Sequence, residues 1–352
     1  MTGINGPIRV LVVDDSPLVC QVLGRLLETD PAVRVIGYAA DGKEAVEKTF
    51  QLKPDMITMD IRMPGMDGLE ATEKIMAYRP TPILIVTSAR DRRGVQVTID
   101  ALAAGALEVV EKPTIMPENS WEVLGASLVE KVKLLAGVRV ITHLRGRSRH
   151  VAERALPAGR ERPRRVVGIG VSTGGPAVLA AILGALPADF QLGLLIVQHI
   201  SEGFMAGLVE WLSQQMRLPV RLAREGDKVQ PGLALMAPEG LHLMVQPGDR
   251  AHLRRALPVG GHRPSADVLL RSVADVYGAA AVGVLLTGMG QDGAEGLRAV
   301  RSAGGYTMVQ DEESCAIFGM PKAAIELGAA QDVLPPAGIV ERLVQLAHRS
   351  VS

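Results

Sequence analysis

The chain has 352 residues, of which 47% are hydrophobic and 22% charged, and its 38 basic side chains are balanced by 38 acidic ones. This length suits two domains of ordinary size, and a net charge of zero gives no general attraction to nucleic acid or to a membrane surface. Cys20 and Cys315 are too few and too far apart in the sequence to indicate a disulfide framework or a thiolate metal site. With neither a secretory signal nor an apolar run long enough to cross a bilayer, we expect a cytoplasmic protein without membrane insertion.

The first part of the chain alternates short aliphatic runs with amphipathic stretches. We expect strands over Val10 to Val13, Arg34 to Gly37, Met56 to Met59, Ile83 to Val86 and Val109 to Val110. Continuous aliphatic strands with helical connections predict an α/β fold with a doubly wound parallel sheet. The carboxyl ends of such strands share one edge of the sheet, where a crevice forms.

Five polar residues follow these strands at the shared edge. Asp14 and Asp15 end the first strand, Asp60 the third and Thr87 the fourth, and Lys112 follows the fifth. Three neighbouring carboxylates repel one another unless a cation binds, and oxygen ligands of this kind suit Mg²⁺. Lys112 and Thr87 can bind phosphoryl oxygens, so Asp60 is the candidate nucleophile that forms an acyl phosphate. A single aspartate is usually a helix cap or a surface acid, but five matching strand ends favour a phosphate site.

This part of the chain resembles the receiver domain of two-component response regulators. Four segments carry the resemblance: Asp14-Asp15, Met59 to Gly68, Thr87-Ser88 and Lys112-Pro113. It implies a flavodoxin-like domain over residues 1–137, in which a histidine kinase phosphorylates Asp60, the three aspartates hold Mg²⁺, and Thr87 and Lys112 bind the phosphoryl group. One position departs from the pattern, because Val109 stands where such domains often have an aromatic switch residue.

Residues 138–164 have a different composition. They are rich in arginine, contain two prolines and show little apolar periodicity. This composition predicts a solvated basic linker. Without interleaved aromatic residues or a recognition-helix pattern, the linker gives no reason to expect nucleic-acid binding, although its charge is compatible with an acidic partner.

A second series of aliphatic strands begins after the linker. We expect strands over Val166 to Val171, Leu192 to Val197, Ala279 to Leu286 and Thr307 to Val309. The second half is therefore a second α/β domain with a doubly wound sheet, over residues 165–352.

Serine, histidine and aspartate each follow one of these strands. Ser172 lies on a glycine-rich turn before a helix expected over Ala177 to Leu186, where free backbone N–H groups can stabilise a developing negative charge. His199 and Asp292 follow the next aliphatic strands, so the three side chains can meet as nucleophile, general base and orienting acid. Of the seven histidines, only His199 directly follows a long buried-type strand.

Each of these residues also has a simpler interpretation. Ser172 could be a helix cap or part of a dinucleotide loop, His199 a strand-end hydrogen bonder, and Asp292 the cap of a helix that starts near Ala294. The pattern Gly170-x-Ser172-x-Gly174 matches the nucleophile elbow of α/β-hydrolases. Their partners follow in the order serine, acid, histidine, however, and here the order is serine, histidine, acid.

With these residues, the second domain resembles the chemotaxis protein-glutamate methylesterases (the CheB family). The segments that carry the resemblance are Gly168 to Pro176, Val197 to Ile200, Arg263 to Leu269, Thr287 to Gly293 and Gly319 to Pro321. The resemblance implies a Rossmann-like three-layer α/β/α domain and assigns roles in catalysis to Ser172, Thr173, His199 and Asp292, with the backbone N–H of Met289 as oxyanion donor.

The resemblance also implies the reaction and its partners. The substrates are glutamate γ-methyl esters on methyl-accepting chemoreceptors, with glutamine deamidation as a second reaction, and phosphorylation by a chemotaxis-type histidine kinase activates the enzyme. We expect a monomer that needs Mg²⁺ for phosphorylation and no cofactor for the ester chemistry. The alternative is a receiver-controlled interaction or transcription module, which would need a recognition helix or a basic groove in the second half.

Overall fold

The computed structural model describes residues 6–88, 91–112, 119–138, 140 and 165–348. The chain falls into two compact units, residues 1–142 and 143–352. Of the expected linker, residues 138–164, all but two residues lie outside the described residues, as do both termini of the chain. None of the described helices combines the length and the apolarity that a membrane crossing requires.

The first unit contains a five-stranded sheet in which all paired strands are parallel. The strands, in the order β2-β1-β3-β4-β5, are β1 (Ile8–Val13), β2 (Val33–Ala39), β3 (Met56–Met59), β4 (Ile83–Thr87) and β5 (Glu108–Glu111). This order is that of a flavodoxin-like fold, and each strand lies where the sequence predicts one. β1, β3 and β4 are almost wholly buried because helices cover both faces of the sheet.

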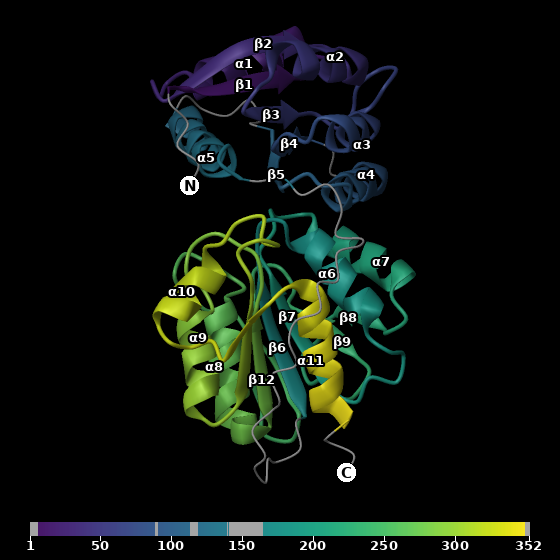
Figure 1. Ribbon diagram of the computed structural model, residues 1–352, viewed down its shortest axis with the longest axis vertical. Coiled ribbons are helices and arrows are strands. Elements are labelled where there is room, and N and C mark those ends of the chain that lie inside the picture. The colour runs from purple at the N-terminus through teal and green to yellow at the C-terminus, as the bar shows by residue number, and fades with distance from the viewer. Residues whose placement is uncertain (1–5, 89–90, 113–118, 139, 141–164, 349–352) are drawn as a thin grey trace. The chain divides into compact units, whose positions relative to one another are not determined.

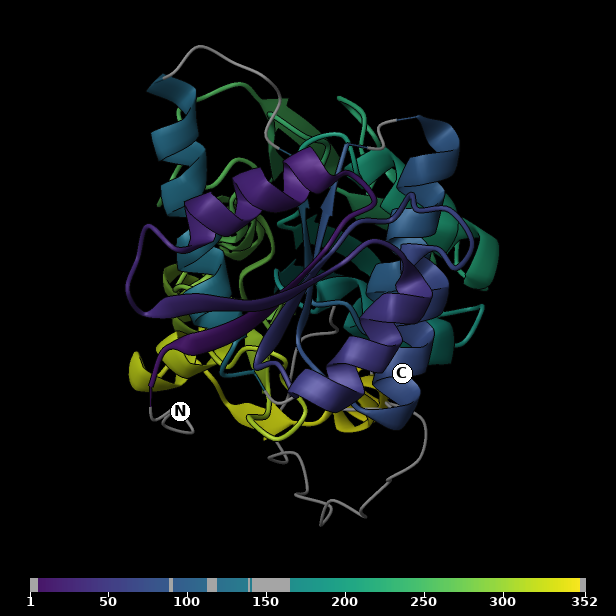
Figure 2. The same cartoon turned by 90° about the horizontal axis from the view of Figure 1, so that it is seen from above.

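Helices α1 and α5 cover one face of this sheet, and α2, α3 and α4 cover the other (Figures 1 and 2). Their bounds are α1 (Pro17–Leu27), α2 (Gly42–Leu52), α3 (Gly68–Tyr78), α4 (Arg92–Ala103) and α5 (Asn119–Leu135). Four of them begin at a side-chain cap, since Ser16, Asp41, Asp67 and Asp91 each accept a hydrogen bond from a backbone N–H of the first turn.

The second unit is built on a seven-stranded sheet, again parallel throughout its described pairs. Its strands, in the order β14-β13-β12-β6-β7-β9-β8, are β6 (Val166–Val171), β7 (Gly193–Gln198), β8 (Val220–Leu222), β9 (Ala234–Met236), β12 (Ala281–Leu285), β13 (Tyr306–Gln310) and β14 (Asp332–Leu334). The three-residue strands β8, β9 and β14 were not predicted. A separate antiparallel hairpin, β10 (His242–Gln246) and β11 (Arg250–Arg254), was also not predicted.

One expected strand begins later than predicted. Residues Gly278–Ala280 form a short 3-10 helix, and β12 starts at Ala281. Gly278 has a φ of 50°, a conformation that interrupts a strand, and an aliphatic run alone does not reveal such a break.

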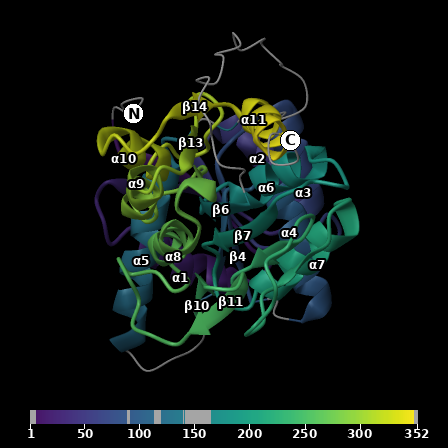
Figure 3. The ribbon, with the colours of Figure 1, turned by 90° about the horizontal axis from the view of Figure 1, so that it is seen from below.

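Helices cover both faces of the second sheet and complete three layers. As seen from below, α8, α9 and α10 lie on one side of β6 and β7, and α6, α7 and α11 lie on the other (Figure 3). The bounds are α6 (Gly175–Ala185), α7 (Met205–Gln215), α8 (Ala266–Tyr277), α9 (Ala294–Ser302), α10 (Met320–Glu326) and α11 (Pro336–His348). The predicted α/β fold class, with two doubly wound parallel sheets, is confirmed.

Candidate active site

The carboxylate cluster of the first unit lies at the carboxyl edge of its sheet, as predicted. Asp14 and Asp60 are buried, Asp15 is exposed, and one ligand oxygen of each lies within 4.8 Å of the others. Three carboxylate oxygens at this spacing, one of them open to water, are a donor set that fits Mg²⁺, which keeps several waters when it binds. These residues can therefore hold a divalent cation.

Lys112 neutralises part of this cluster. Its Nζ lies 2.7 Å from Asp60 Oδ2, in a well-aligned hydrogen bond, and 2.7 Å from Asp14 Oδ2. The contact with Asp14 is an ion pair without hydrogen-bond alignment, since that oxygen accepts no hydrogen bond from a described residue. Burial raises the pKa of Asp60 and outweighs the opposing effect of Lys112. Burial alone would lower the pKa of Lys112, but its two carboxylate partners raise it.

Thr87 ends β4 beside this cluster. It is buried, and its carbonyl accepts the backbone N–H of Lys112 at 2.9 Å, which fixes the two residues relative to each other. Val109, at the position expected for an aromatic switch residue, is fully buried in β5.

In the second unit, Ser172 lies on the turn between β6 and α6. Its backbone N–H donates to the carbonyl of Thr287 at 3.0 Å, which ties the turn to the end of β12. Gly174 has a φ of 75°, so the chain can reverse into the helix. Gly288 packs against the serine so closely that a Cβ there would lie 2.6 Å from the Ser172 Cβ. The turn therefore holds Ser172 in one place, with its side chain partly exposed.

Gln198 joins the serine turn to the histidine. Its side-chain Nε2 donates to the carbonyl oxygens of Ser172 at 2.8 Å and of His199 at 2.7 Å. The side chain is buried, and its Oε1 would lie 2.1 Å from a Cβ on Gly175, so only glycine fits there. No role was predicted for Gln198, although it directly precedes His199 and lies in the segment Val197 to Ile200, which carries the family resemblance.

His199 and Asp292 are brought together as predicted. The atoms His199 Nε2 and Asp292 Oδ2 lie 2.9 Å apart, and this contact is an ion pair only when the ring is protonated. Burial would raise the pKa of Asp292, but the His199 ring, the Ser265 hydroxyl and the Ala266 N–H together lower it to about 2. The carboxylate is thus charged at every pH at which His199 can act as a base.

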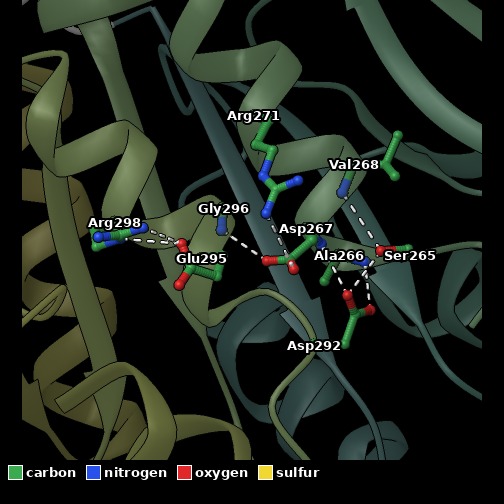
Figure 4. Close-up of polar contacts among 9 residues, drawn as sticks. All are labelled: Ser265, Ala266, Asp267, Val268, Arg271, Asp292, Glu295, Gly296 and Arg298. Atoms are coloured by element: carbon green, nitrogen blue, oxygen red, sulfur yellow. Dashed lines mark hydrogen bonds and ion pairs between the residues drawn. The ribbon is translucent and has the colours of Figure 1, made fainter. Parts of the chain in front are cut away.

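Asp292 does not cap the helix that follows it, contrary to the simpler interpretation of its position. The N-cap of α9 is Gly293, without a side-chain bond. Asp292 instead accepts hydrogen bonds at the start of α8, from Ser265 Oγ at 2.7 Å, Ala266 N at 2.7 Å and Asp267 N at 3.1 Å (Figure 4). Since α8 precedes Asp292 by more than twenty residues in the sequence, local patterns could not reveal this contact.

A second carboxylate, that of Asp267, accepts a hydrogen bond from the start of α9. Asp267 Oδ1, in the first turn of α8, accepts the backbone N–H of Gly296 in α9 at 2.7 Å (Figure 4). Asp292 thus lies at the N-terminus of α8, and Asp267 at the N-terminus of α9. At both positions the helix dipole favours negative charge. This exchange fixes the backbone on both sides of Asp292.

The remaining predicted residues surround the serine. Thr173 is buried, and its carbonyl accepts the Thr287 hydroxyl at 3.0 Å. The backbone N–H of Met289 donates to no described residue, so it is available to a substrate oxygen. His199 Nδ1 is likewise buried and, like Nε2, accepts or donates no aligned hydrogen bond among the described residues.

Comparisons with known proteins identify the family of each unit. The family model for CheB methylesterase matches residues 167–343, and that for the response regulator receiver domain matches residues 10–119. A protein-glutamate methylesterase/protein-glutamine glutaminase of Geobacter metallireducens is 46% identical over 97% of this chain and 99% of its own length. One of Anaeromyxobacter dehalogenans is 47% identical over 97% of this chain and 100% of its own length.

A solved structure supports the same assignment. The CheB methylesterase catalytic domain of Thermotoga maritima is 37% identical, with a TM-score of 0.51, and covers 52% of this chain and 98% of its own. That coverage is the share expected if the second unit alone corresponds to a catalytic domain. With a receiver domain in front and relatives matched over nearly their full length, this chain belongs to the CheB methylesterase family.

Proposed function

We propose that this protein is a phosphorylation-activated protein-glutamate methylesterase, which hydrolyses glutamate γ-methyl esters on methyl-accepting chemoreceptors and releases methanol. The observation that carries the proposal is the contact between His199 and a fully hydrogen-bonded Asp292, beside the Ser172 turn. Family membership supplies the substrate class, because the relatives are named for this ester and for glutamine.

The ester is cleaved in two steps. Ser172 Oγ attacks the ester carbonyl carbon while His199 Nδ1 takes the hydroxyl proton, and the ring becomes a cation beside the charged Asp292. His199 then gives that proton to the departing methoxide, which leaves as methanol. Water attacks the acyl-enzyme with His199 again as base, and the products are the glutamate carboxylate and free Ser172. Glutamine reacts in the same way, with ammonia as the leaving group.

The tetrahedral intermediate has a negatively charged oxygen that needs donors. The backbone N–H of Met289 points to this role because it is not bonded within the described chain. The carbonyl of Thr173 accepts the hydroxyl of Thr287, which supports the turn that carries Ser172. This chemistry uses side chains and backbone groups alone, and we propose no cofactor for it.

The first unit controls this activity. Asp60 accepts a phosphoryl group from a chemotaxis-type histidine kinase, Lys112 pairs with the phosphoryl oxygens, and Thr87 donates a hydrogen bond to one of them. Asp14, Asp15 and Asp60 would hold a Mg²⁺ ion, whose charge would offset that of the carboxylates and of the phosphoryl group. Phosphorylation then shifts the chain toward its active arrangement, and a tenfold gain requires about 1.4 kcal/mol.

The proposal includes the setting of the enzyme. The receiver occupies residues 1–137, the basic linker residues 138–164 and the catalytic domain residues 165–352. The protein acts in the cytoplasm as a monomer, with the kinase and the receptors as partners, and it neither binds nucleic acid nor inserts into the membrane.

Methanol release from methylated chemoreceptor, with and without a small-molecule phosphodonor, tests the chemistry and its control together. We expect Ser172→Ala to lower turnover by a factor on the order of 10⁴ to 10⁶, as in dissected serine triads. Ser213→Ala is the matched control, because Ser213 is an exposed serine on α7 whose hydroxyl donates to the carbonyl of Glu210. Methanol release by Ser172→Ala at the rate of Ser213→Ala would refute the assignment.

A further inference from the structure

A buried histidine outside the triad contacts both ends of the loop that lies beside the catalytic base. His242 opens strand β10 and is 1% exposed. Its Nε2 lies 3.1 Å from the carbonyl oxygen of Leu257, and its Nδ1 lies 3.2 Å from the backbone nitrogen of Ser265. Because a backbone N–H can only donate and a carbonyl can only accept, the ring is neutral with its proton on Nε2.

At the C-terminal end of this loop, Ser265 connects His242 with Asp292. Ser265 is held at its backbone by His242, and its hydroxyl donates to Asp292 Oδ1 at 2.7 Å (Figure 4). Asp292 Oδ2 is the atom 2.9 Å from His199. A continuous series of short polar contacts between buried groups therefore connects His242 with the edge of the catalytic ring.

The loop that begins at Leu257, the other contact of His242, reaches the face of the His199 ring. Val259 and His262 exchange two backbone hydrogen bonds of 3.0 Å around Gly260 and Gly261, whose φ angles are 58° and 86°. This tight turn places the His262 ring parallel to the His199 ring, with centroids 4.1 Å apart and 3° between the planes. The loop that His242 anchors at Leu257 thus covers one face of the catalytic base.

We propose that His242 is a positioning residue for catalysis, which fixes Asp292 at the edge of the His199 ring through Ser265 and fixes His262 on its face through the loop Leu257–Ser265. The inference rests on the proposed ester chemistry, since it concerns the base of that reaction. A general base works only within a narrow range of positions, and a displacement of about 1 Å costs about 10²-fold in rate. Neither His242 nor Ser265 touches the substrate carbonyl in this scheme, so both act through other residues.

A purely structural role for His242 and Ser265 makes a different prediction, and the chain offers a matched control. Ser272 is also a buried serine on α8, and its hydroxyl accepts the Val245 N–H of β10 at 3.0 Å and donates to the Leu269 carbonyl at 2.7 Å. It therefore links the same helix to the same hairpin but does not contact Asp292. Ser272→Ala removes a comparable buried hydrogen bond without altering the contacts of the triad.

The experiment measures the rate at which a fluorophosphonate labels Ser172 in the full chain, together with the melting temperature and the kcat and KM of methanol release. We expect His242→Phe and Ser265→Ala each to lower the labelling rate and kcat by about 10- to 100-fold with KM unchanged. Ser265→Thr, which keeps the hydroxyl, restores most of the rate. Ser272→Ala lowers the melting temperature as much as Ser265→Ala but labels at the wild-type rate.

The double variant tests whether the two residues act in one series. In His242→Phe/Ser265→Ala the two losses do not multiply, because the second substitution removes a contact that the first has already displaced. Wild-type labelling by either single variant, or equal slowing by Ser272→Ala, would overturn the proposal. If His242→Phe does not fold, His242→Leu takes its place with the same expected loss, while Ser265→Ala and its threonine rescue test the contact between Ser265 and Asp292. Normal labelling of the wild-type chain without receptor demethylation would instead refute the proposed function alone.

Discussion

Asp60 and Asp292 are both buried aspartates at the carboxyl edge of a parallel sheet, each beside a basic partner, yet their surroundings are opposite. Asp60 accepts one backbone N–H, from Ile61, and the Lys112 ammonium. Burial and the neighbouring Asp14 carboxylate keep its pKa raised in spite of Lys112. Asp292 receives a hydroxyl and two backbone N–H groups in addition to the histidine contact, and its pKa is lowered to about 2.

The difference matches the roles that we propose for the two carboxylates. A group that is to bind a cation and form a bond to phosphorus keeps oxygen lone pairs free, and it tolerates unfavourable burial until those ligands arrive. A group that is to orient a histidine is fully hydrogen-bonded, so its charge and position do not change during the reaction. The first site is therefore built to change state, and the second to remain constant.

The largest effect that separates the two sites is expected from the amide substitutions. Asp292→Asn removes the negative charge that orients and stabilises the His199 cation, so turnover falls by about 10⁴ with or without a phosphodonor. Asp60→Asn should leave turnover without phosphodonor near the wild-type value. The measurement is methanol release by the two full-length variants. A loss of comparable size in Asp60→Asn would break the contrast, because it would make the receiver carboxylate necessary for the chemistry itself.

The two aspartates could be predicted from the sequence. Their hydrogen-bond donors could not, where these lie far away along the chain. Strand-end positions identified Asp60 and Asp292 because long aliphatic strands predict a parallel sheet with one shared edge. The donors to Asp292 were not identified, since Ser265 lies 27 residues earlier and its segment carried only a family resemblance. His262 follows no long aliphatic strand, and its stacking on His199 depends on a tertiary turn. The interpretation of Asp292 as the cap of the helix near Ala294 was wrong, because its carboxylate accepts the first N–H groups of α8 instead.

The next largest effect is expected from substitutions of Gln198. They test whether the second site depends on groups that hold Ser172 and His199 in fixed positions. Gln198→Leu leaves the carbonyl oxygens of Ser172 and His199 without their shared donor, at a cost of about 1–3 kcal/mol for each buried group. We expect a lower melting temperature and a loss of turnover of about 10- to 100-fold, since the serine and the base lose their common support. Gln198→Glu keeps the shape but replaces the donor with an acceptor, and it should be as damaging. Wild-type turnover in Gln198→Leu would show that the backbone holds both residues unaided.

Control by phosphorylation is expected to have a smaller effect, on the order of tenfold. Acetyl phosphate with Mg²⁺ should raise the methanol release of the wild-type chain, and neither Asp60→Asn nor the wild-type chain with a chelator should respond. Asp41→Asn is the matched control, because Asp41 is a helix cap outside the carboxylate cluster. Equal stimulation of Asp60→Asn would mean that the phosphodonor acts elsewhere in the chain.

The last effect is on stability, and its sign should differ between the two carboxylates. Asp292 has a folded pKa of about 2 and an unfolded one of about 3.9, so it stabilises the fold above pH 4 by about 2–3 kcal/mol and loses this contribution between about pH 4 and pH 2. The pKa of Asp60 is raised on folding, so its ionisation opposes the fold at neutral pH. In calorimetry of the full chain at pH 7, Asp292→Asn should lower the unfolding temperature of the second unit and Asp60→Asn should raise that of the first. At pH 2 the deficit of Asp292→Asn should largely disappear. Shifts of the same sign at pH 7 would mean that burial, and not the number of donors, governs both aspartates.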